Sequence, residues 1–300
     1  MTIGCCLGFV ILLAALVLFL TIFVKSNEME PPVFTELAEV QHFDSHELQG
    51  VTLSELPPDI VPIKLVIEAK GCNVTLVPDG PPGAVRLSGE YDTANGSFEF
   101  LHDASASGQK FSIAYRSHRM MLLNLGSDEM DQAWDRNNLL VHLPLDSAFD
   151  IEIIHEGGEV DLDLSGVPVY MLHLESKYSQ VNLRNAVKNP LVMKEMTLKH
   201  SIGETKLKNL QNYRFDLLNL DFSMGEFRLK ANDLFYRSAT IDMNVSLGGL
   251  ILNLPENVEI INRVDSDSGN LFMSEHEFSE KNATVTLEGR VKWGEASVSQ

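Results

Sequence analysis

The sequence predicts an all-β protein, a parallel β-solenoid (β-helix) of two-strand repeats about 22 residues long, with one N-terminal transmembrane helix. Three observations predict it: a recurring phrase, an alternation of apolar and polar residues within that phrase, and an uncharged apolar segment near the start of the chain. Successive copies of the phrase start 21, 24, 22, 23, 21 and 25 residues apart, a spacing typical of stacked repeats. The copies are Gly158–Leu162, Ser179–Leu183, Gly203–Leu207, Gly225–Leu229, Gly248–Leu252, Gly269–Met273 and Gly294–Val298.

Each phrase alternates in the manner of a strand with one buried face. In the first copy, Val160 and Leu162 are apolar and Asp161 and Asp163 are charged, and this period of two is typical of a half-buried strand. A second alternating run follows each of the first six phrases; the runs are Val169–Leu174, Met193–His200, Phe215–Phe222, Ala239–Val245, Val258–Val264 and Val285–Val291. Two short strands cannot bury their apolar face alone, so the repeats are expected to stack into one core. An antiparallel β-sandwich is the alternative, and the recurring register favours the solenoid.

Three consecutive runs carry a resemblance to a known family. They are Leu139-Leu-Val-His-Leu-Pro-Leu145, Phe149-Asp-Ile-Glu-Ile153 and Gly157-Gly-Glu-Val-Asp-Leu-Asp-Leu-Ser-Gly166. This pattern resembles the bacterial toast-rack β-solenoid family, which includes adhesin-like domains and the C-terminal domains of LiaF-like envelope-stress proteins. The resemblance extends over roughly residues 61–300 and contains no catalytic signature. It implies a bacterial, non-enzymatic domain of the cell envelope.

The N-terminal segment Ile3–Val24 contains 22 residues and no charge. A helix of this length spans a hydrocarbon core of about 30 Å. A cleaved signal peptide is the alternative, but the segment lacks a basic n-region and a cleavage site with small residues. The predicted organisation is a transmembrane anchor (residues 1–25), a juxtamembrane spacer (26–62) and the β-solenoid (63–300), with irregular first rungs (63–156) and regular rungs (157–300). Within the spacer, Phe34–Val40 is predicted to form a short amphipathic helix.

Two features of the sequence favour opposite orientations of the chain in the membrane. Lys25 directly follows the apolar segment and no Lys or Arg precedes it, which favours a cytoplasmic C-terminus. The acidic stretch that follows and the resemblance to envelope proteins favour the opposite orientation. We expect a single-pass protein of the inner cell membrane with an extracytoplasmic domain.

The composition restricts the classes of partner and site. The chain has 23 Lys and Arg residues against 42 Asp and Glu residues, a formal net charge of −19, which repels nucleic acid. Of its three cysteines, Cys5 and Cys6 lie in the predicted anchor, so the solenoid has neither an intradomain disulfide nor a cysteine-based metal site. Cys72 is predicted to be a small core residue.

No catalytic, cofactor-binding or metal-binding residue is predicted. The common hydrolase and nucleotide-binding motifs are missing from the sequence. Asp161 and Asp163 would lie on one strand face at a separation compatible with a carboxylate pair, but the next repeats add no acids to them. His173 and His200 fall in neighbouring repeats without aligning, and the acidic segment Ser127–Asn138 is either a solvated loop or a partner-binding loop. The chain is therefore expected not to be an enzyme.

Stacking the repeats predicts a basic patch on an otherwise acidic body. Rungs lie about 4.8 Å apart, which brings together the outward-facing residues Arg184, Lys206, Lys208, Arg228 and Lys230. Two interpretations follow. Either Glu204, Glu226 and loop acids neutralise the patch, or it binds an acidic glycan, a wall polymer or an acidic partner protein.

The predicted function is a membrane-anchored, adhesin-like or envelope-associated binding or scaffold domain. Its expected partners are the membrane, an envelope protein or an anionic glycan, and a second copy of the chain. One alternative is a self-assembling scaffold similar to bactofilins, because the C-terminal rung Gly294–Gln300 lacks an obvious cap. The other is a polysaccharide-active β-helix enzyme.

Overall fold

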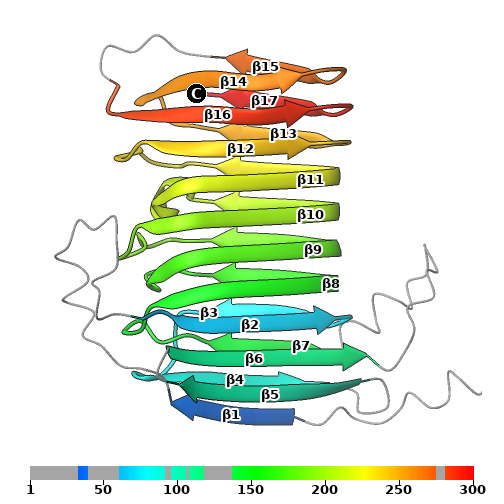
Figure 1. Cartoon of the computed structure of the whole chain (residues 1–300), viewed down its shortest axis with the longest axis vertical. Coiled ribbons are helices and arrows are strands. Elements are labelled where there is room, and N and C mark those ends of the chain that lie inside the picture. Colours follow the sequence, from blue (N-terminus) through cyan, green and yellow to red (C-terminus); the bar gives the residue numbers. More distant parts are fainter. Residues whose placement is uncertain (1–32, 40–60, 92–95, 106–107, 118–136, 275–280) are drawn as a thin grey trace, which may run out of the picture.

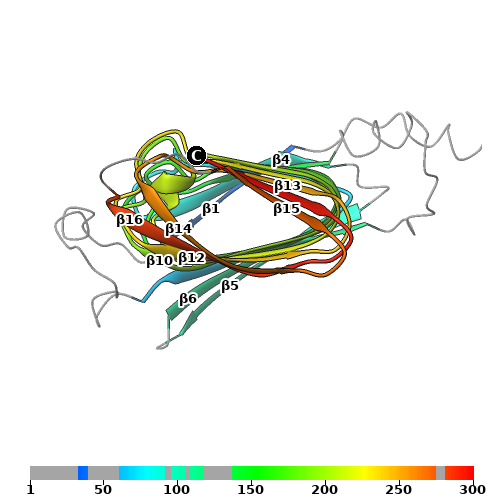
Figure 2. The ribbon, with the colours of Figure 1, turned by 90° about the horizontal axis from the view of Figure 1, so that it is seen from above.

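The computed structural model describes residues 61–91, 96–105, 108–117, 137–274 and 281–300, together with the backbone of 33–39. In these residues the strands join into one sheet of 17 strands, wound into a flattened coil with two broad faces (Figures 1 and 2). The strands are β1 (Val33–Glu39), β2 (Ile63–Lys70), β3 (Asn73–Val77), β4 (Ala84–Glu90), β5 (Gly96–Ser105), β6 (Gly108–Ser117), β7 (Asn138–His142), β8 (Phe149–Asp163), β9 (Val169–Arg184), β10 (Met193–Lys208), β11 (Phe215–Lys230), β12 (Ala239–Val245), β13 (Gly249–Asn253), β14 (Val258–Ser266), β15 (Asn270–Ser274), β16 (Ala283–Val291) and β17 (Glu295–Ser299). A short 3₁₀ helix, η1 (Leu210–Tyr213), precedes β11.

The central rungs β8 to β11 pair in parallel along their whole length. This confirms the predicted all-β, mostly parallel stack. In these rungs, however, the two strands predicted for each repeat form one strand that bends from one broad face to the other. The bend lies at Tyr178, Gly203 and Gly225, whose φ angles are 54°, 138° and 123°. A positive φ turns the chain sharply, so the strand changes face without losing its ladder of hydrogen bonds.

Close approach of neighbouring backbones explains why glycine recurs at this bend. A Cβ atom added at Gly203 would collide with the carbonyl oxygen of Ser179, and one added at Gly225 would collide with the carbonyl oxygen of Gly203. The bend is therefore a column of closely stacked backbones, which leaves no room for a side chain.

The core lies between the two faces and is filled by every second residue of each rung. Leu162, Leu183, Leu207, Leu229 and Leu252 follow one another in adjacent rungs and are all at most 1% exposed. Such identical, in-register layers bury one continuous apolar column. Cys72 is fully buried in the same core, as predicted.

Buried asparagines hold the loops at the opposite edge of the coil. Asn189 accepts a hydrogen bond from the backbone amide of Val169 at 3.2 Å and donates one to its carbonyl oxygen at 2.7 Å. Asn212 donates to the carbonyl oxygen of Asn185 at 2.8 Å. These side chains satisfy backbone groups that the loops would otherwise bury without partners.

The order of the rungs in space differs from their order in the sequence at the C-terminal end. The β12–β13 rung pairs with β16–β17, and β16–β17 pairs in turn with β14–β15. Figure 1 shows β16 and β17 inside β14 and β15. The expectation that the C-terminal segment Gly294–Gln300 forms the open end is therefore wrong, since β14–β15 is the outermost rung there.

The N-terminal rungs are also reached out of order. β2 lies between β8 and β6, and β3 lies between β8 and β7. β5 joins β6 in an antiparallel hairpin, and β4 joins β7 antiparallel. Among the described residues of 63–156, β4 and β5 are therefore antiparallel strands added outside the parallel stack.

Residues 34–39 of the segment predicted as a short helix, Phe34–Val40, lie in the strand β1. β1 pairs antiparallel with β4 from Val33 opposite Glu90 to Glu39 opposite Ala84. A helix of seven residues is marginal on its own, whereas the free edge of β4 supplies a full set of backbone partners. The helix prediction was therefore wrong.

Some predicted segments lie outside the described residues. These are the anchor at residues 1–25 and most of the acidic segment 127–138. Among the residues that the structure describes, no helix is long and apolar enough to cross a membrane.

Candidate binding surface

The five predicted basic residues lie on the outer face formed by the second halves of β9, β10 and β11. Lys206 is in register with Arg228, and Lys208 is in register with both Arg184 and Lys230. Every second residue of a strand points to the same side, so the five residues form two adjacent columns on one face.

Three of the five cations are paired with carboxylates. The Arg184 Nε atom donates to Asp163 at 2.9 Å, and the Lys206 Nζ atom donates to Glu204 at 2.7 Å. Arg228 forms a bidentate pair with Glu226, with two hydrogen bonds of 2.7 Å.

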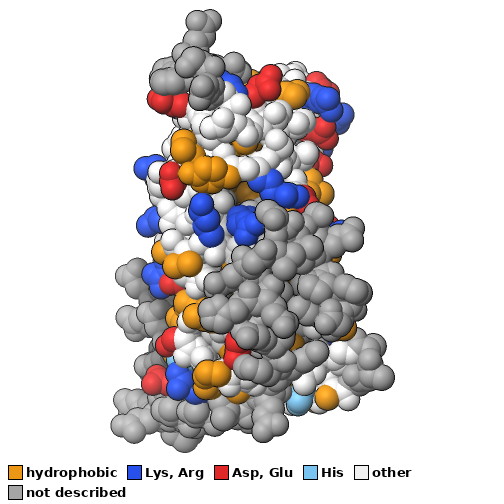
Figure 3. Space-filling view, turned by 90° about the vertical axis from the view of Figure 1, so that its left-hand side faces the viewer, with side chains coloured by type: hydrophobic (Ala, Val, Ile, Leu, Met, Phe, Trp, Pro, Cys, Tyr) orange, Lys and Arg blue, Asp and Glu red, His pale blue; other side chains and the backbone are white. Residues whose placement is uncertain are grey.

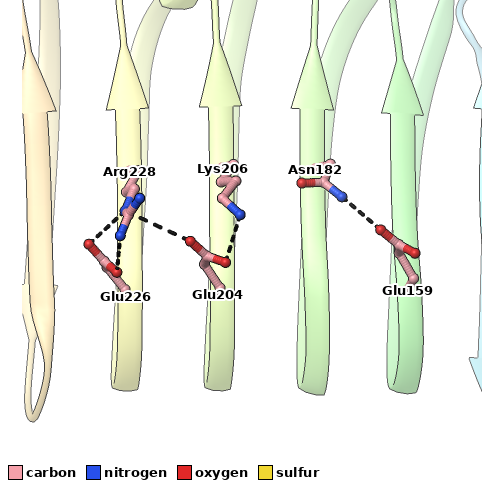
Figure 4. A network of polar contacts seen from close by, with 6 residues as sticks. All are labelled: Glu159, Asn182, Glu204, Lys206, Glu226 and Arg228. Atoms are coloured by element: carbon pink, nitrogen blue, oxygen red, sulfur yellow. Dashed lines mark hydrogen bonds and ion pairs between the residues drawn. The ribbon is translucent and has the colours of Figure 1, made fainter. Parts of the chain in front are cut away.

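The pairs continue from rung to rung (Figure 4). Arg228 also reaches Glu204 of the neighbouring rung at 3.8 Å, and Asn182 donates to Glu159 at 2.9 Å. The hydrogen bond from Arg228 lowers the pKa of Glu226. These residues lie at the surface, so each pair contributes little to stability. Their main effect is to neutralise the column that contains Lys206 and Arg228.

Lys208 and Lys230 remain exposed and have no carboxylate partner among the described residues. They are neighbours in register, and Arg184 lies on the other side of Lys208. Adjacent like charges repel each other slightly. Positive charge therefore concentrates at the end of the strands, where the chain enters the loops.

The adjoining loops extend this positive region around the edge of the coil. The Lys188 Nζ atom lies 4.4 Å from the centre of the exposed Tyr236 ring, a geometry favourable for a cation–π interaction. Arg237 is paired with Asp216 at 2.5 Å. Burial, together with the nearby charge of Arg237, lowers the pKa of Arg214.

Lys and Arg side chains gather over the middle rungs of this edge in Figure 3. We call the group Arg184, Lys188, Lys208 and Lys230 the basic corner. The sequence comparison of repeats missed Lys188 because it lies in a loop rather than in the recurring phrase. A loop position has no fixed register, so only the folded chain brings it to the strand ends.

A groove of about 580 Å³ lies on the other broad face of the coil, where the β5–β6 hairpin meets β2 and the first halves of β8 and β9. Its charges are mixed: Lys70 and Glu156 lie 3.6 Å apart, and Arg116 and Glu99 lie 3.0 Å apart. The lining contains four carboxylates and three cations, so the groove has no large excess of one charge to select a ligand.

The carboxylates considered for catalysis are not a free pair. The Asp163 side chain accepts hydrogen bonds from the Ser165 backbone amide at 3.1 Å and from the Ser165 hydroxyl at 2.5 Å, in addition to its contact with Arg184. Asp161 lies in register with Asn182 of the next rung, which adds no acid. Within the described residues, no group of three or more His, Cys, Asp or Glu residues could hold a metal ion.

His173 and His200 do not align with each other, as the sequence indicated. His173 is in register with Thr197, and His200 is in register with Ser176, which is itself in register with His155. His155, Ser176 and His200 thus form a buried polar column. The His155 Nε2–H donates to the Cys72 carbonyl oxygen at 2.9 Å.

The described strands form a flattened, mostly parallel coil with strands added antiparallel at one end, which is the architecture of a β-solenoid. Residues 64–297 match the family model described as Toastrack DUF4097, so the chain belongs to this family, as its sequence predicted. Among solved structures, the chain is similar to a candidate cell adhesion protein from Clostridium sporogenes ATCC 15579, with 10% identity and a TM-score of 0.43, over 90% of this chain and 100% of that one. No curated protein matches the sequence.

Proposed function

We propose that the protein is a non-enzymatic envelope scaffold that binds an acidic glycan through the basic corner. The observation that carries this proposal is the pair Lys208 and Lys230, adjacent in register and exposed, with no carboxylate partner among the described residues. Elsewhere the chain carries a large excess of acidic residues. A local positive region on such a body attracts and orients an anionic polymer.

The rigid spacing of the rungs suits a repeating ligand. Arg184, Lys208 and Lys230 are held on consecutive strands, about 4.8 Å apart. The cations are therefore arranged before binding, which lowers the entropy cost of association. In the loops that follow β9 and β11, the contact between Lys188 and Tyr236 adds an aromatic face and a further cation at the same edge of the coil.

The first test reverses the two unpaired charges. In the full chain, Lys208→Glu with Lys230→Glu is expected to weaken binding to polygalacturonate about tenfold or more at low salt, because two attractions become repulsions. The matched control is Lys110→Glu with Lys199→Glu, which makes the same change of charge at exposed lysines on the other face. Equal binding by both double variants would remove the basic corner from the proposal.

The proposal also holds that Ile3–Val24 anchors the scaffold in the inner membrane with the solenoid on the extracytoplasmic side. The length and apolarity of that segment support the anchor. A tag placed after Gln300 is expected to be removed by protease added to cells whose outer envelope has been opened. Protection of the tag until the cells are lysed would place the solenoid in the cytoplasm and exclude an envelope glycan as its ligand.

End-to-end stacking receives less support. The outermost rung β14–β15 carries Glu259, Arg263, Asp265 and Asp267, all exposed. Charges on an edge strand are a common means of blocking edge-to-edge pairing.

A further inference from the structure

A row of exposed apolar side chains follows the edge of the coil opposite the basic corner. Each member directly precedes the Gly or Ser with which the recurring phrase of its rung begins. The members, with their exposed fractions, are Tyr178 (39%), Ile202 (39%), Met224 (48%), Leu247 (46%) and Trp293 (70%). We call these five residues the apolar ridge.

The ridge is continuous in space although its members are far apart in the sequence. Ile202 is directly paired with Met224. The flanking pairs place Tyr178 beside Ile202 and Leu247 beside both Met224 and Trp293. Five rungs at a spacing of about 4.8 Å make a strip about 19 Å long.

The ridge has defined ends. The rung before Tyr178 has Gly157 at the equivalent position, and the rung after Trp293 has Ser268. Single exposed apolar residues are ordinary, but a contiguous apolar strip usually marks an interaction surface. The bend itself requires only the small residue that follows, so folding of the coil does not explain five large apolar side chains in a row.

The two sides of the ridge carry opposite charges. On the side of the first strand halves lie Lys177 and Lys292, both exposed, and Lys177 is paired with Glu175 at 3.7 Å. On the other side lie Glu204, Glu226 and Glu295. Lys292 and Glu295 flank Trp293 in the same rung, and neither forms an ion pair with a described residue.

We propose that the apolar ridge binds the ridge of a second copy of this chain, side by side and parallel, about a twofold axis that runs along the ridge. This axis places each rung opposite its own equivalent, with Met224 facing Met224. It also places the side with Lys292 opposite the partner's side with Glu295, so opposite charges meet twice. The antiparallel arrangement would place Lys177 opposite Lys292, where like charges repel.

The other possible occupant, a lipid surface, fits the charges poorly. Glu295 borders the ridge without an ion-pair partner among the described residues, Glu204 and Glu226 are balanced by Lys206 and Arg228, and the whole chain has a net charge of −19. Anionic headgroups would be repelled. A second copy instead offers the complementary side chains. The strip is narrow compared with the roughly 800 Å² that each partner buries in a standard interface, so the dimer is expected to be weak in dilute solution and favoured where the chains are concentrated.

Cysteine cross-linking in membranes of cells that express the full chain tests the contact. The background carries Cys5→Ser and Cys6→Ser, while the buried Cys72 is kept. With a mild oxidant, Met224→Cys is expected to form a disulfide-linked dimer at least about tenfold faster than Val187→Cys, because contact raises the effective concentration. Val187 is the control because it is 59% exposed and lies on the opposite edge. Equal rates would overturn the proposal.

Three further outcomes distinguish the arrangement and the occupant. Trp293→Cys is expected to cross-link to itself; cross-linking only between Tyr178→Cys and Trp293→Cys chains would overturn the parallel arrangement. Adding Ile202→Lys and Leu247→Lys to Met224→Cys is expected to abolish the dimer while the circular dichroism spectrum is unchanged. Blocked labelling of Met224→Cys by an aqueous maleimide without dimer formation would show a lipid or another protein on the ridge and overturn the proposal.

Discussion

At the scale of single residues, the buried His155 and the half-buried Asp150 in β8 affect the pH dependence of stability in opposite directions. Burial lowers the pKa of His155 to about 4, partly offset by its hydrogen bond to the Cys72 carbonyl. Burial also raises the pKa of Asp150 to about 6, against the attraction of Lys64 and Lys194. Each group therefore favours its neutral form in the folded chain. Their contributions to stability have opposite pH dependence.

The contribution of His155 is lost at low pH. The unfolded chain binds a proton here from about pH 6.5 downward, whereas the folded chain resists protonation until about pH 4, so stability falls as pH falls through this window. His155→Gln keeps a donor for the Cys72 carbonyl and does not titrate. We expect wild-type stability to decline by about 3 kcal/mol more than that of the variant between pH 7.5 and pH 4. Denaturant unfolding at both pH values measures this, and parallel declines would contradict it.

The contribution of Asp150 changes in the other direction. Its carboxylate is charged in the folded chain only above about pH 6, so it destabilises the fold at neutral and alkaline pH and not below pH 4. Asp150→Asn is expected to raise the free energy of unfolding by about 1 to 2 kcal/mol at pH 8, a range reduced for partial exposure to solvent. The gain should vanish at pH 4. A variant that is less stable than wild type at pH 8 would show that the charge is well solvated.

At the scale of the element, close contact between backbones determines which residue can occupy the bend of a rung. Gly225 has a φ of 123° and stacks on the carbonyl oxygen of Gly203. Gly249, one rung further on, has no atom within 4 Å of the position where a Cβ would lie. The two glycines are close in the fold but differ in the constraint that they meet.

This difference makes a matched pair of substitutions. Gly225→Ala is expected to lower the free energy of unfolding by about 3 kcal/mol or more, because it combines overpacking against backbone with an unfavourable φ. Gly249→Ala is expected to change it by less than about 1 kcal/mol. Denaturant melts of both variants check the contrast, and similar losses would mean that the bend relaxes easily.

At the scale of the whole molecule, the chain forms the outermost rung, β14–β15, before it forms the β16–β17 rung that lies beneath it. β14–β15 therefore rests on β16–β17 and not on the β12–β13 rung that precedes it in the sequence. The last segment of the chain holds the outermost rung in place. Its loss should affect residues well upstream of the cut.

Truncation tests this arrangement. Removal of residues 283–300 is expected to leave residues 258–282 without their neighbouring rung, because every ladder pair of β14 and β15 is with β16 or β17. Protease should then digest 258–282 rapidly, and the remaining body should be as stable as a chain ending at residue 257. Survival of 258–282 would mean that β14–β15 can pair directly with β12–β13.

The sequence alone determined the family, the parallel stack and the columns of outward residues, because a repeat of fixed length fixes which residues become neighbours. It placed Lys208 beside Lys230 without any coordinates. The same repeat predicted sequential rungs and missed the exchange of β14–β15 with β16–β17, because each rung presents similar edges and only packing selects the neighbour. Lys188 belongs to the basic corner because of the path of a loop, and the side chain of Asp163 is hydrogen-bonded to Ser165 at the start of another loop. Neither loop has a register that the repeat could predict. Those contacts were decided by the tertiary structure, since loop geometry depends on the core beneath it.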